Sequence, residues 1–270
     1  MKNSKNTKYT WNLTPLFKSD NDPEIEKDLK VVKEKSYKFI NKWKDRDDYL
    51  KNPEILKQAL DEYETWVRYY GTSGKPGYYF SLRTRQDQNN PELKAKDNKI
   101  DSFSTKIDND ITFFYLNISK IDKKLQNKFL NNKKLKKYNH LLERAFAKSK
   151  YLLTEPEERI INLKENIAYG NWVNMVSSLL SKEEREVLLE NGIKKTKNFS
   201  EIIDIFDSKH KKVRDSACRV FNDIIYKYVD IAEHELNSIL ENKKIDDELR
   251  KINRPDFTRH LNDDIETEIV

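Results

Sequence analysis

Glycine and proline are too scarce in this chain for a fold that changes direction every few residues. The 270 residues contain five glycines and seven prolines. Sandwiches and barrels of short strands need a turn every ~8–12 residues, and those turns usually contain one of these two residues. An all-β fold is therefore excluded. Leucine and isoleucine recur at the spacing of helix faces, so the sequence predicts an all-α protein of many helices in an elongated arrangement.

Three pairs of an Asx residue and a proline predict where helices begin. Asp22-Pro23, Asn52-Pro53 and Asn90-Pro91 each place a capping side chain before a proline, which suits the first turn of a helix. Behind the third pair, apolar residues keep helical spacing from Leu93 to Ile118, which predicts a helix of 29 residues, or roughly 43 Å at 1.5 Å per residue. Further helices are predicted over residues 134–149, 154–169, 171–180 and 209–241.

Local patterns predict the other boundaries. Ser181–Glu184 is a hydroxyl residue followed three positions later by glutamate, the capping box of a helix start. Gly71–Gly77 holds three of the five glycines, and we interpret it as a helix C-cap followed by a flexible linker rather than a phosphate-binding loop. A second, less distinct domain boundary is expected near residues 192–200.

We predict two domains from these boundaries. A helical N-terminal domain covers residues 1–198, and the first helices of a second domain cover residues 199–270. Residues Asn262–Val270 have the pattern of a helix beginning, because capping residues are followed by acidic side chains that suit the positive end of a helix dipole. Since the sequence stops there, we expect it to be a fragment; a naturally short helical tail is the alternative.

The charge composition permits an anionic partner without indicating one. The 52 basic and 46 acidic residues give a formal net charge of +6, and 40 of the basic residues are lysine. Phosphate recognition favours arginine, whereas a lysine excess often only keeps a surface soluble. Cys218 is the single cysteine, predicted to be buried and inert on an inward helix face. The polar segment Met1–Thr10 and the lack of a long apolar run predict a cytoplasmic protein without a membrane partner.

The histidines do not have the spacing of a metal site. A helical zinc site needs two imidazoles at positions i and i+4, because only that spacing directs both at one ion. His234-Glu235 begins such a pattern, but Ser238 stands where the second histidine is required. With one cysteine, thiolate zinc sites are excluded as well. We therefore assign no catalytic residue and no metal ligand in this sequence, while a dispersed site using His140, His210, His234 or His260 stays open.

Residues 120–150 form a basic segment that supports an alternative function. Ten lysines and Arg144 are opposed only by Asp122 and Glu143, which could attract a polyanion and would make this a nucleic-acid-binding or protein-interaction module. We favour a solvated lysine-rich face with Leu125, Phe129, Leu135, Leu142 and Phe146 packed beneath it. For Arg254, Arg259 and His260 we likewise favour salt-bridged structural roles.

Several segments, in order, resemble the N-terminal half of the oligoendopeptidase F family, which groups with the thimet-oligopeptidase-like zinc metallopeptidases. They begin with a Trp-Asn-Leu-Thr box, and the last three of them resemble the entry to that family's catalytic half. The segments are Trp11–Phe17, His140–Arg144, Tyr151–Glu158, Ala168–Trp172, Glu233–Asn237, Asp247–Arg250 and Arg254–Ile265.

The resemblance implies that the parent protein is a zinc metalloendopeptidase acting on oligopeptides. In that family a His-Glu-x-x-His helix and a downstream glutamate hold zinc, and no position up to Val270 matches them. The resemblance thus implies that this chain is one wall of a substrate channel, binds no zinc and is inactive alone. Its substrate-contacting residues cannot be assigned from sequence. A separate chain carrying the catalytic half could complete it.

Overall fold

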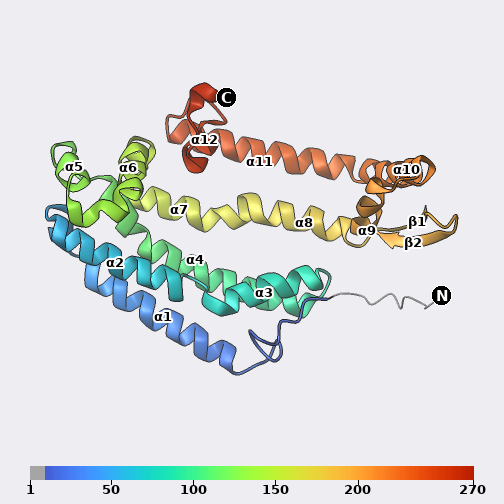
Figure 1. Ribbon diagram of the computed structural model, residues 1–270, viewed down its shortest axis with the longest axis horizontal. Helices are drawn as coiled ribbons and strands as arrows, with labels where there is room; N and C mark the ends of the chain where they lie inside the picture. Colours follow the sequence, from blue (N-terminus) through green and yellow to red (C-terminus); the bar gives the residue numbers. More distant parts are fainter. Residues whose placement is uncertain (1–9) are drawn as a thin grey trace. The chain divides into compact units, whose positions relative to one another are not determined.

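The computed structural model describes residues 10–270 and consists mostly of helices (Figure 1), which confirms the predicted helical fold class. The segment Met1–Thr10, on which the prediction about a signal sequence depended, lies almost entirely outside these residues. The α-helices are α1 (Glu24–Trp43), α2 (Pro53–Tyr69), α3 (Gly74–Gln86), α4 (Pro91–Ser119), α5 (Lys123–Leu130), α6 (Asn139–Lys148), α7 (Glu155–Glu165), α8 (Asn171–Leu180), α9 (Phe199–Asp204), α10 (Lys211–Lys227), α11 (Val229–Leu249) and α12 (Phe257–Asp263). Two strands, β1 (Glu184–Leu188) and β2 (Lys194–Asn198), form an antiparallel hairpin.

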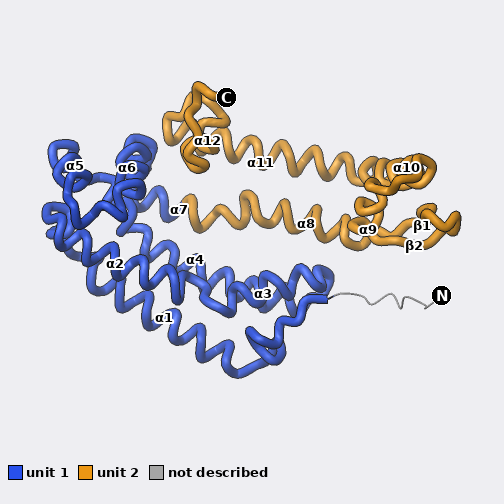
Figure 2. Tube along the Cα trace, in the orientation of Figure 1, with its two compact units in different colours: residues 1–160 blue, residues 161–270 orange. Residues whose placement is uncertain are grey.

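The chain divides into two compact units, unit 1 over residues 1–160 and unit 2 over residues 161–270 (Figure 2). Unit 1 contains α1 to α6 and the start of α7. Unit 2 contains the remaining helices and the hairpin. The domain boundary at 198/199 stays a prediction.

The predicted helix starts of unit 1 are present. The Asn52 side-chain oxygen accepts a hydrogen bond from the Glu54 amide at 2.9 Å, and Asn90 caps α4 through the Glu92 amide at 3.0 Å. Each amide so bonded would otherwise lack a partner in the first helical turn. The third capped helix, α4, contains 29 residues, which matches the span of its predicted apolar face.

Aromatic side chains fill the centre of unit 1. Trp43 and Tyr49 are fully buried and meet edge to face at 5.7 Å between ring centroids. Phe39 contacts Phe114 in the same geometry at 5.0 Å. The indole N–H of Trp66, which would be costly to bury without a partner, donates to the Ser36 hydroxyl at 2.9 Å. These contacts fix α1, α2 and α4 against one another.

The predicted linker at Gly71–Gly77 is shorter than expected, because α3 begins inside it. Gly71 and Gly74 adopt φ angles of +56° and +59°, which L side chains rarely adopt. A Cβ atom on Gly74 would also lie 2.6 Å from a methyl carbon of Val32. The glycines therefore provide a tight, closely packed turn between α2 and α3, and the prediction of a flexible connection there is wrong.

The helix start predicted at Ser181–Glu184 is wrong, because β1 begins at Glu184. Val187 of this strand is fully buried, and Gly192 has the positive φ of +77° that suits the turn to β2. A capping box does occur at the end of β2. There Asn198 accepts from the Glu201 amide at 2.9 Å and starts α9.

The single helix predicted over residues 209–241 is interrupted at Tyr228. Its φ and ψ of −112° and 13° separate α10 from α11. The Tyr228 hydroxyl donates to the carboxylate of Glu183, whose side chain is only 4% exposed and also pairs with Lys227 and Arg185. This buried carboxylate 45 residues away holds the break in place, so no local pattern could reveal it.

The helix start predicted at Asn262–Val270 is also wrong, because a helix ends there. Asp264 adopts a left-handed conformation with φ of +61°, and the amide of Ile265 donates to the His260 carbonyl at 3.0 Å. This is the bond pattern of a helix C-terminus, and aspartate is one of the few residues that tolerate the left-handed region. The acidic residues after it lead into a single 3₁₀ turn, Thr267–Ile269, and the Glu266 side chain at the start of that turn makes no capping hydrogen bond.

Candidate functional site

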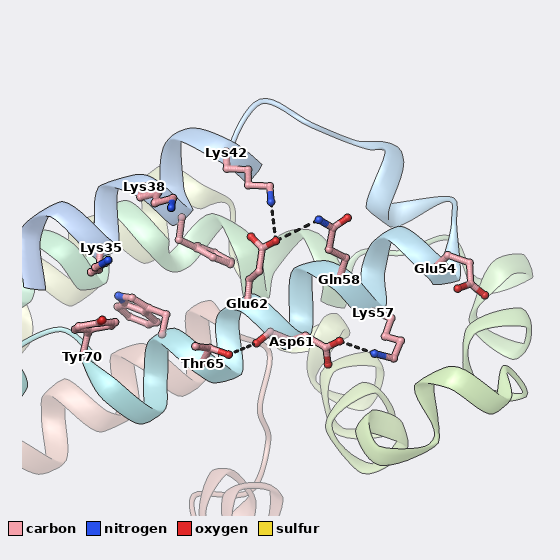
Figure 3. A pocket seen from close by; sticks show the side chains of 12 residues that line it. Lys35, Lys38, Lys42, Glu54, Lys57, Gln58, Asp61, Glu62, Thr65 and Tyr70 are labelled. Carbon is pink, nitrogen blue, oxygen red and sulfur yellow. Dashed lines mark hydrogen bonds and ion pairs between the residues drawn. The ribbon is translucent and has the colours of Figure 1, made fainter.

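A groove of about 620 Å³ runs between α1 and α2 in unit 1 (Figure 3). Its volume falls within the range of ligand sites, which are commonly ~300–1,000 Å³. The groove has charged walls and an aromatic floor. Its lining consists of Lys35, Lys38, Phe39 and Lys42 from α1, and of Glu54, Lys57, Gln58, Asp61, Glu62, Thr65, Trp66 and Tyr70 from α2 and its C-terminal end.

The α1 wall is cationic. Lys35, Lys38 and Lys42 are spaced by three and four residues, which places their side chains along one face of the helix. Between them, the buried rings of Phe39 and Trp66 form the floor and stack at 6.5 Å between centroids. The helix spacing thus produces a row of ammonium groups above apolar surface.

The α2 wall carries carboxylates that are already paired across the groove. Glu62 accepts from Lys42 at 2.6 Å and from the indole N–H of Trp43 at 3.0 Å. Burial opposes ionisation of Glu62, but these hydrogen bonds outweigh it and lower the pKa of the carboxyl. Asp61 pairs with Lys57 at 2.5 Å along the same helix.

Lysines of the basic segment 120–150 neutralise the same wall from outside the groove. Lys134 pairs with Glu54 at 2.8 Å, and Lys137 pairs with Asp61 at 2.8 Å. Tyr138 also donates to Asp61 at 2.7 Å. Partial burial raises the pKa of Asp61, but the lysine and tyrosine hydrogen bonds prevail and hold it well below the usual range for aspartate.

The apolar residues of the basic segment lie as the favoured interpretation requires. Phe129, Leu135 and Leu142 are fully buried in the unit 1 core, with Leu125 and Phe146 packed against it. Lys134 and Lys137 of this segment thus form ion pairs with carboxylates of α2. The alternative function as a nucleic-acid or protein-interaction module stays a prediction.

Lys35 and Lys38 differ from the other lysines of the groove. Neither makes an ion pair with a carboxylate anywhere in residues 10–270, although Lys35 lies 5.9 Å from the centroid of the Tyr70 ring. The hydroxyl of Thr65 opposite them donates back to the Asp61 carbonyl at 2.8 Å and keeps its acceptor lone pair. At this end the lining residues Lys35, Lys38, Thr65 and Tyr70 carry two ammonium groups and two hydroxyl groups.

The groove was not predicted from the sequence. The spacing of Lys35, Lys38 and Lys42 on a predicted helix was a usable signal for a cationic face. Which of these lysines are neutralised depends on Glu62 and other residues brought in by packing. The pairing of these lysines therefore depends on the tertiary structure and not on local sequence.

The four histidines are dispersed, as their spacing predicts. His140, His210 and His234 are exposed, and His260 is buried with its Nε2 3.6 Å from Asp256. In the part of the chain that the structure describes, no group of three or more His, Cys, Asp or Glu side chains could hold a metal ion. The predictions that this chain contains no catalytic residue and no metal ligand stay predictions.

The arginines near the C-terminus are salt-bridged, as favoured above. Arg254 pairs with Asp256 at 2.6 Å, and Arg259 pairs with Asp263 one helical turn away. The prediction of a buried Cys218 is wrong, because this side chain is exposed. The buried face of α10 is set by Val213, Ala217 and Ile224, and Cys218 lies one residue past that face.

A second surface lies in unit 2, on the packed helices α8 and α11. Six of the ten residues of α8 are apolar, yet none of the ten is buried. In α11 the buried residue is Asp247, while Leu236 and Leu240 are 58% and 62% exposed. The apolar core of unit 2 is instead centred on Val187, Ile202, Ala217 and Ile224. The α8–α11 pair therefore exposes apolar side chains mainly on α11, whereas in α8 Met175 is exposed and the other five apolar side chains are partly buried.

None of the helices within residues 10–270 combines the length and the apolar composition that crossing a bilayer requires.

Sequence comparison connects the middle of the chain to a peptidase family. Residues 117–183 match the family model described as Oligopeptidase F. Oligoendopeptidase F of Lactococcus lactis subsp. cremoris is 28% identical over 155 residues, which is 57% of this chain and 25% of the relative. An oligoendopeptidase F homologue of Borreliella burgdorferi is 27% identical over 160 residues, 59% of this chain and 26% of the relative. The match thus spans about a quarter of each relative's length.

A solved structure shares the fold over nearly the whole chain. The crystal structure of oligoendopeptidase-F from Enterococcus faecium superimposes with a TM-score of 0.74 and covers 91% of this chain and 46% of that chain. Sequence identity in this alignment is 15%. The likeness therefore concerns the fold, and the sequence relationship comes from the curated relatives.

Proposed function

Because these matches confirm that the chain resembles the N-terminal region of oligoendopeptidase F, we propose that it is the non-catalytic part of an enzyme that hydrolyses oligopeptides. The observation that carries this proposal is the 28% identity over 155 residues to a protein named for that activity. In this proposal the role of the present chain is steric. It forms one wall of the path that the peptide follows.

The α8–α11 pair of unit 2 is the surface we assign to that wall. An extended peptide presents backbone polar groups and side chains of every type, so the wall must tolerate both apolar and polar contacts. Met175 of α8 and Leu240 of α11 provide the apolar contacts, with exposed fractions of 39% and 62%. Asn171, Asn174 and Ser177 of α8 provide the polar contacts.

In this proposal zinc belongs to the complete enzyme and is held outside this chain. Zinc in hydrolases is bound by histidine and carboxylate side chains that converge on one point. The described residues offer no such group, so they do not fit a zinc site, and we assign no reaction step to them. Another segment or a separate chain with the catalytic half would supply the metal ligands.

A peptide hydrolysis assay tests whether the catalytic groups lie outside this chain. The purified 270-residue chain is expected not to cleave a quenched fluorescent oligopeptide in the presence of zinc, because residues 10–270 contain no cluster of side chains that could hold the metal. Zinc-stimulated cleavage that a chelator abolishes would overturn this part of the proposal. Elemental analysis of the dialysed protein provides a second readout that does not depend on activity.

Photocrosslinking tests the wall. A benzoylphenylalanine in place of Met175 is expected to label an added oligopeptide, since that side chain faces the proposed path. The matched control is Leu141 in α6 of unit 1, which is 40% exposed and does not line the α1–α2 groove. Equal labelling at both positions would contradict the assignment of α8–α11 to the peptide path.

A further inference from the structure

We propose that the Lys35–Lys38 end of the α1–α2 groove is a binding site for the carboxylate of an acidic peptide. The proposal concerns unit 1 alone and does not depend on the peptidase function. It rests on the charge balance of the groove, its aromatic surface and its dimensions.

The charge balance leaves two cations in excess at one end. The carboxylates that line the groove all have partners: Glu54 pairs with Lys134, Asp61 with Lys57 and Lys137, and Glu62 with Lys42. Lys35 and Lys38 make no such ion pair within the described residues. An incoming carboxylate would therefore displace no existing ion pair there, whereas elsewhere in the groove it would face paired carboxylates.

The spacing of the two lysines suits one compact anion. Side chains three residues apart on a helix have Cβ atoms ~5–6 Å apart, so two flexible ammonium groups can converge on a single carboxylate. A peptide that carries this carboxylate gains more than a free ion, because the groove continues past it. Tyr70 lies beside Lys35 (Figure 3), and Phe39 and Trp66 also line the groove, so apolar surface is available next to the two lysines.

The same geometry disfavours a polyphosphate backbone. A nucleic acid needs a continuous track of unpaired cations to gain affinity from successive phosphates. Beyond Lys38 the wall is neutral, since Lys42 and Lys57 are engaged by Glu62 and Asp61. The groove therefore fits a ligand with one acidic end and an apolar or neutral body, which a peptide with glutamate or aspartate next to an apolar residue provides.

Binding of a labelled peptide tests the site directly. The probe is a rhodamine-labelled hexapeptide with two adjacent glutamates followed by leucine and phenylalanine, and its counterpart has glutamine in place of both glutamates. Fluorescence anisotropy with the full chain is expected to show ~10-fold weaker binding of the glutamine peptide. A tenfold change in affinity corresponds to ~1.4 kcal/mol, which is reasonable for losing a charge-assisted hydrogen bond to partly exposed lysines.

Matched double variants locate the site on the molecule. K35Q/K38Q is expected to weaken binding of the acidic peptide ~10-fold and to leave the glutamine peptide unaffected. The control K30Q/K33Q removes two exposed lysines with the same spacing from another face of α1 and is expected to have no effect. Unchanged circular dichroism confirms that both variants fold, since all four lysines are exposed.

Three outcomes would overturn the proposal. One is no measurable binding of the acidic peptide to the wild-type chain. Another is equal weakening by K35Q/K38Q and K30Q/K33Q, which would indicate general attraction to a basic surface. The third is tight binding of a single-stranded oligonucleotide that K35Q/K38Q abolishes, which would assign the site to phosphate. The peptidase assay is separate, so either proposal can fail without the other.

Discussion

Replacing Leu142 by alanine should destabilise unit 1 by about 3 kcal/mol, because its side chain is fully buried beneath the basic segment. Removing the buried atoms of a leucine forfeits their transfer free energy and leaves a cavity, and such changes cost ~2–5 kcal/mol together. Leu142 belongs to the same core as Phe129 and Leu135. The substitution therefore tests whether residues 120–150 are a packed part of unit 1 or a loosely attached charged arm.

Leu141 provides the matched control on the same helix. It is 40% exposed, and its replacement by alanine should cost less than ~1 kcal/mol, since little apolar surface leaves a buried environment. Both changes remove the same atoms from adjacent positions of α6. The difference between the two free energies of unfolding therefore isolates burial from helix propensity.

Urea unfolding followed by tryptophan fluorescence measures that difference. In a Trp172→Phe background the remaining tryptophans, Trp11, Trp43 and Trp66, all lie in unit 1. With an m value of ~2 kcal/mol/M, the Leu142 variant should unfold at a midpoint ~1.5 M lower than its parent. Equal midpoints for the two alanine variants would refute the packing of the basic segment described above.

Three further outcomes are expected. Gly74→Ala should lose ~1–3 kcal/mol of stability in thermal unfolding, because the position has a positive φ and the new Cβ atom would lie 2.6 Å from Val32. Gly192→Ala also has a positive φ but open space around it, so it should lose less stability. Equal losses would show that the contact with Val32 does not matter. Hydrogen bonds from lysine keep Asp61 ionised in the folded protein, with its pKa below the ordinary 3.8, so it contributes stability above that pH that is lost on acidification. Asp61→Asn should therefore be less stable than wild type at pH 7, and in urea titrations the difference should begin to narrow only below pH 3.8, as the pH falls toward the much lower pKa of the folded state; a difference that already vanishes above pH 3.8 would argue against this linkage. Cys218 should react with a thiol reagent in native buffer, and a requirement for denaturant would contradict its exposure.

The sequence predicted elements well where short-range chemistry decides them. The starts of α2 and α4 follow from Asn52-Pro53 and Asn90-Pro91, because the capping side chain and the amides it accepts from are neighbours. The start of α3 was missed because it lies among glycines whose conformation depends on the close approach of Val32. Local capping rules predict a helix start only where no packing contact competes with them.

Long-range contacts explain the other errors. The break at Tyr228 depends on the buried carboxylate of Glu183. The β1–β2 hairpin, which begins directly after Glu183, depends on burial of Val187. The groove illustrates the same limit for a binding site. Its lysines could be placed on one helix face, but their pairing depends on α2 and on Lys134 and Lys137, which are distant in sequence.

The exposed apolar side chains of α11, such as Leu236 and Leu240, make the association state of this chain depend on its solvent. Sulfate is excluded from protein surfaces and strengthens the association of apolar groups. Copies of the chain should therefore begin to self-associate at a lower protein concentration as ammonium sulfate is added, and a mild detergent should reverse the effect. Salt and detergent concentrations should therefore be kept constant when measurements on this chain are compared, because they change how many copies associate.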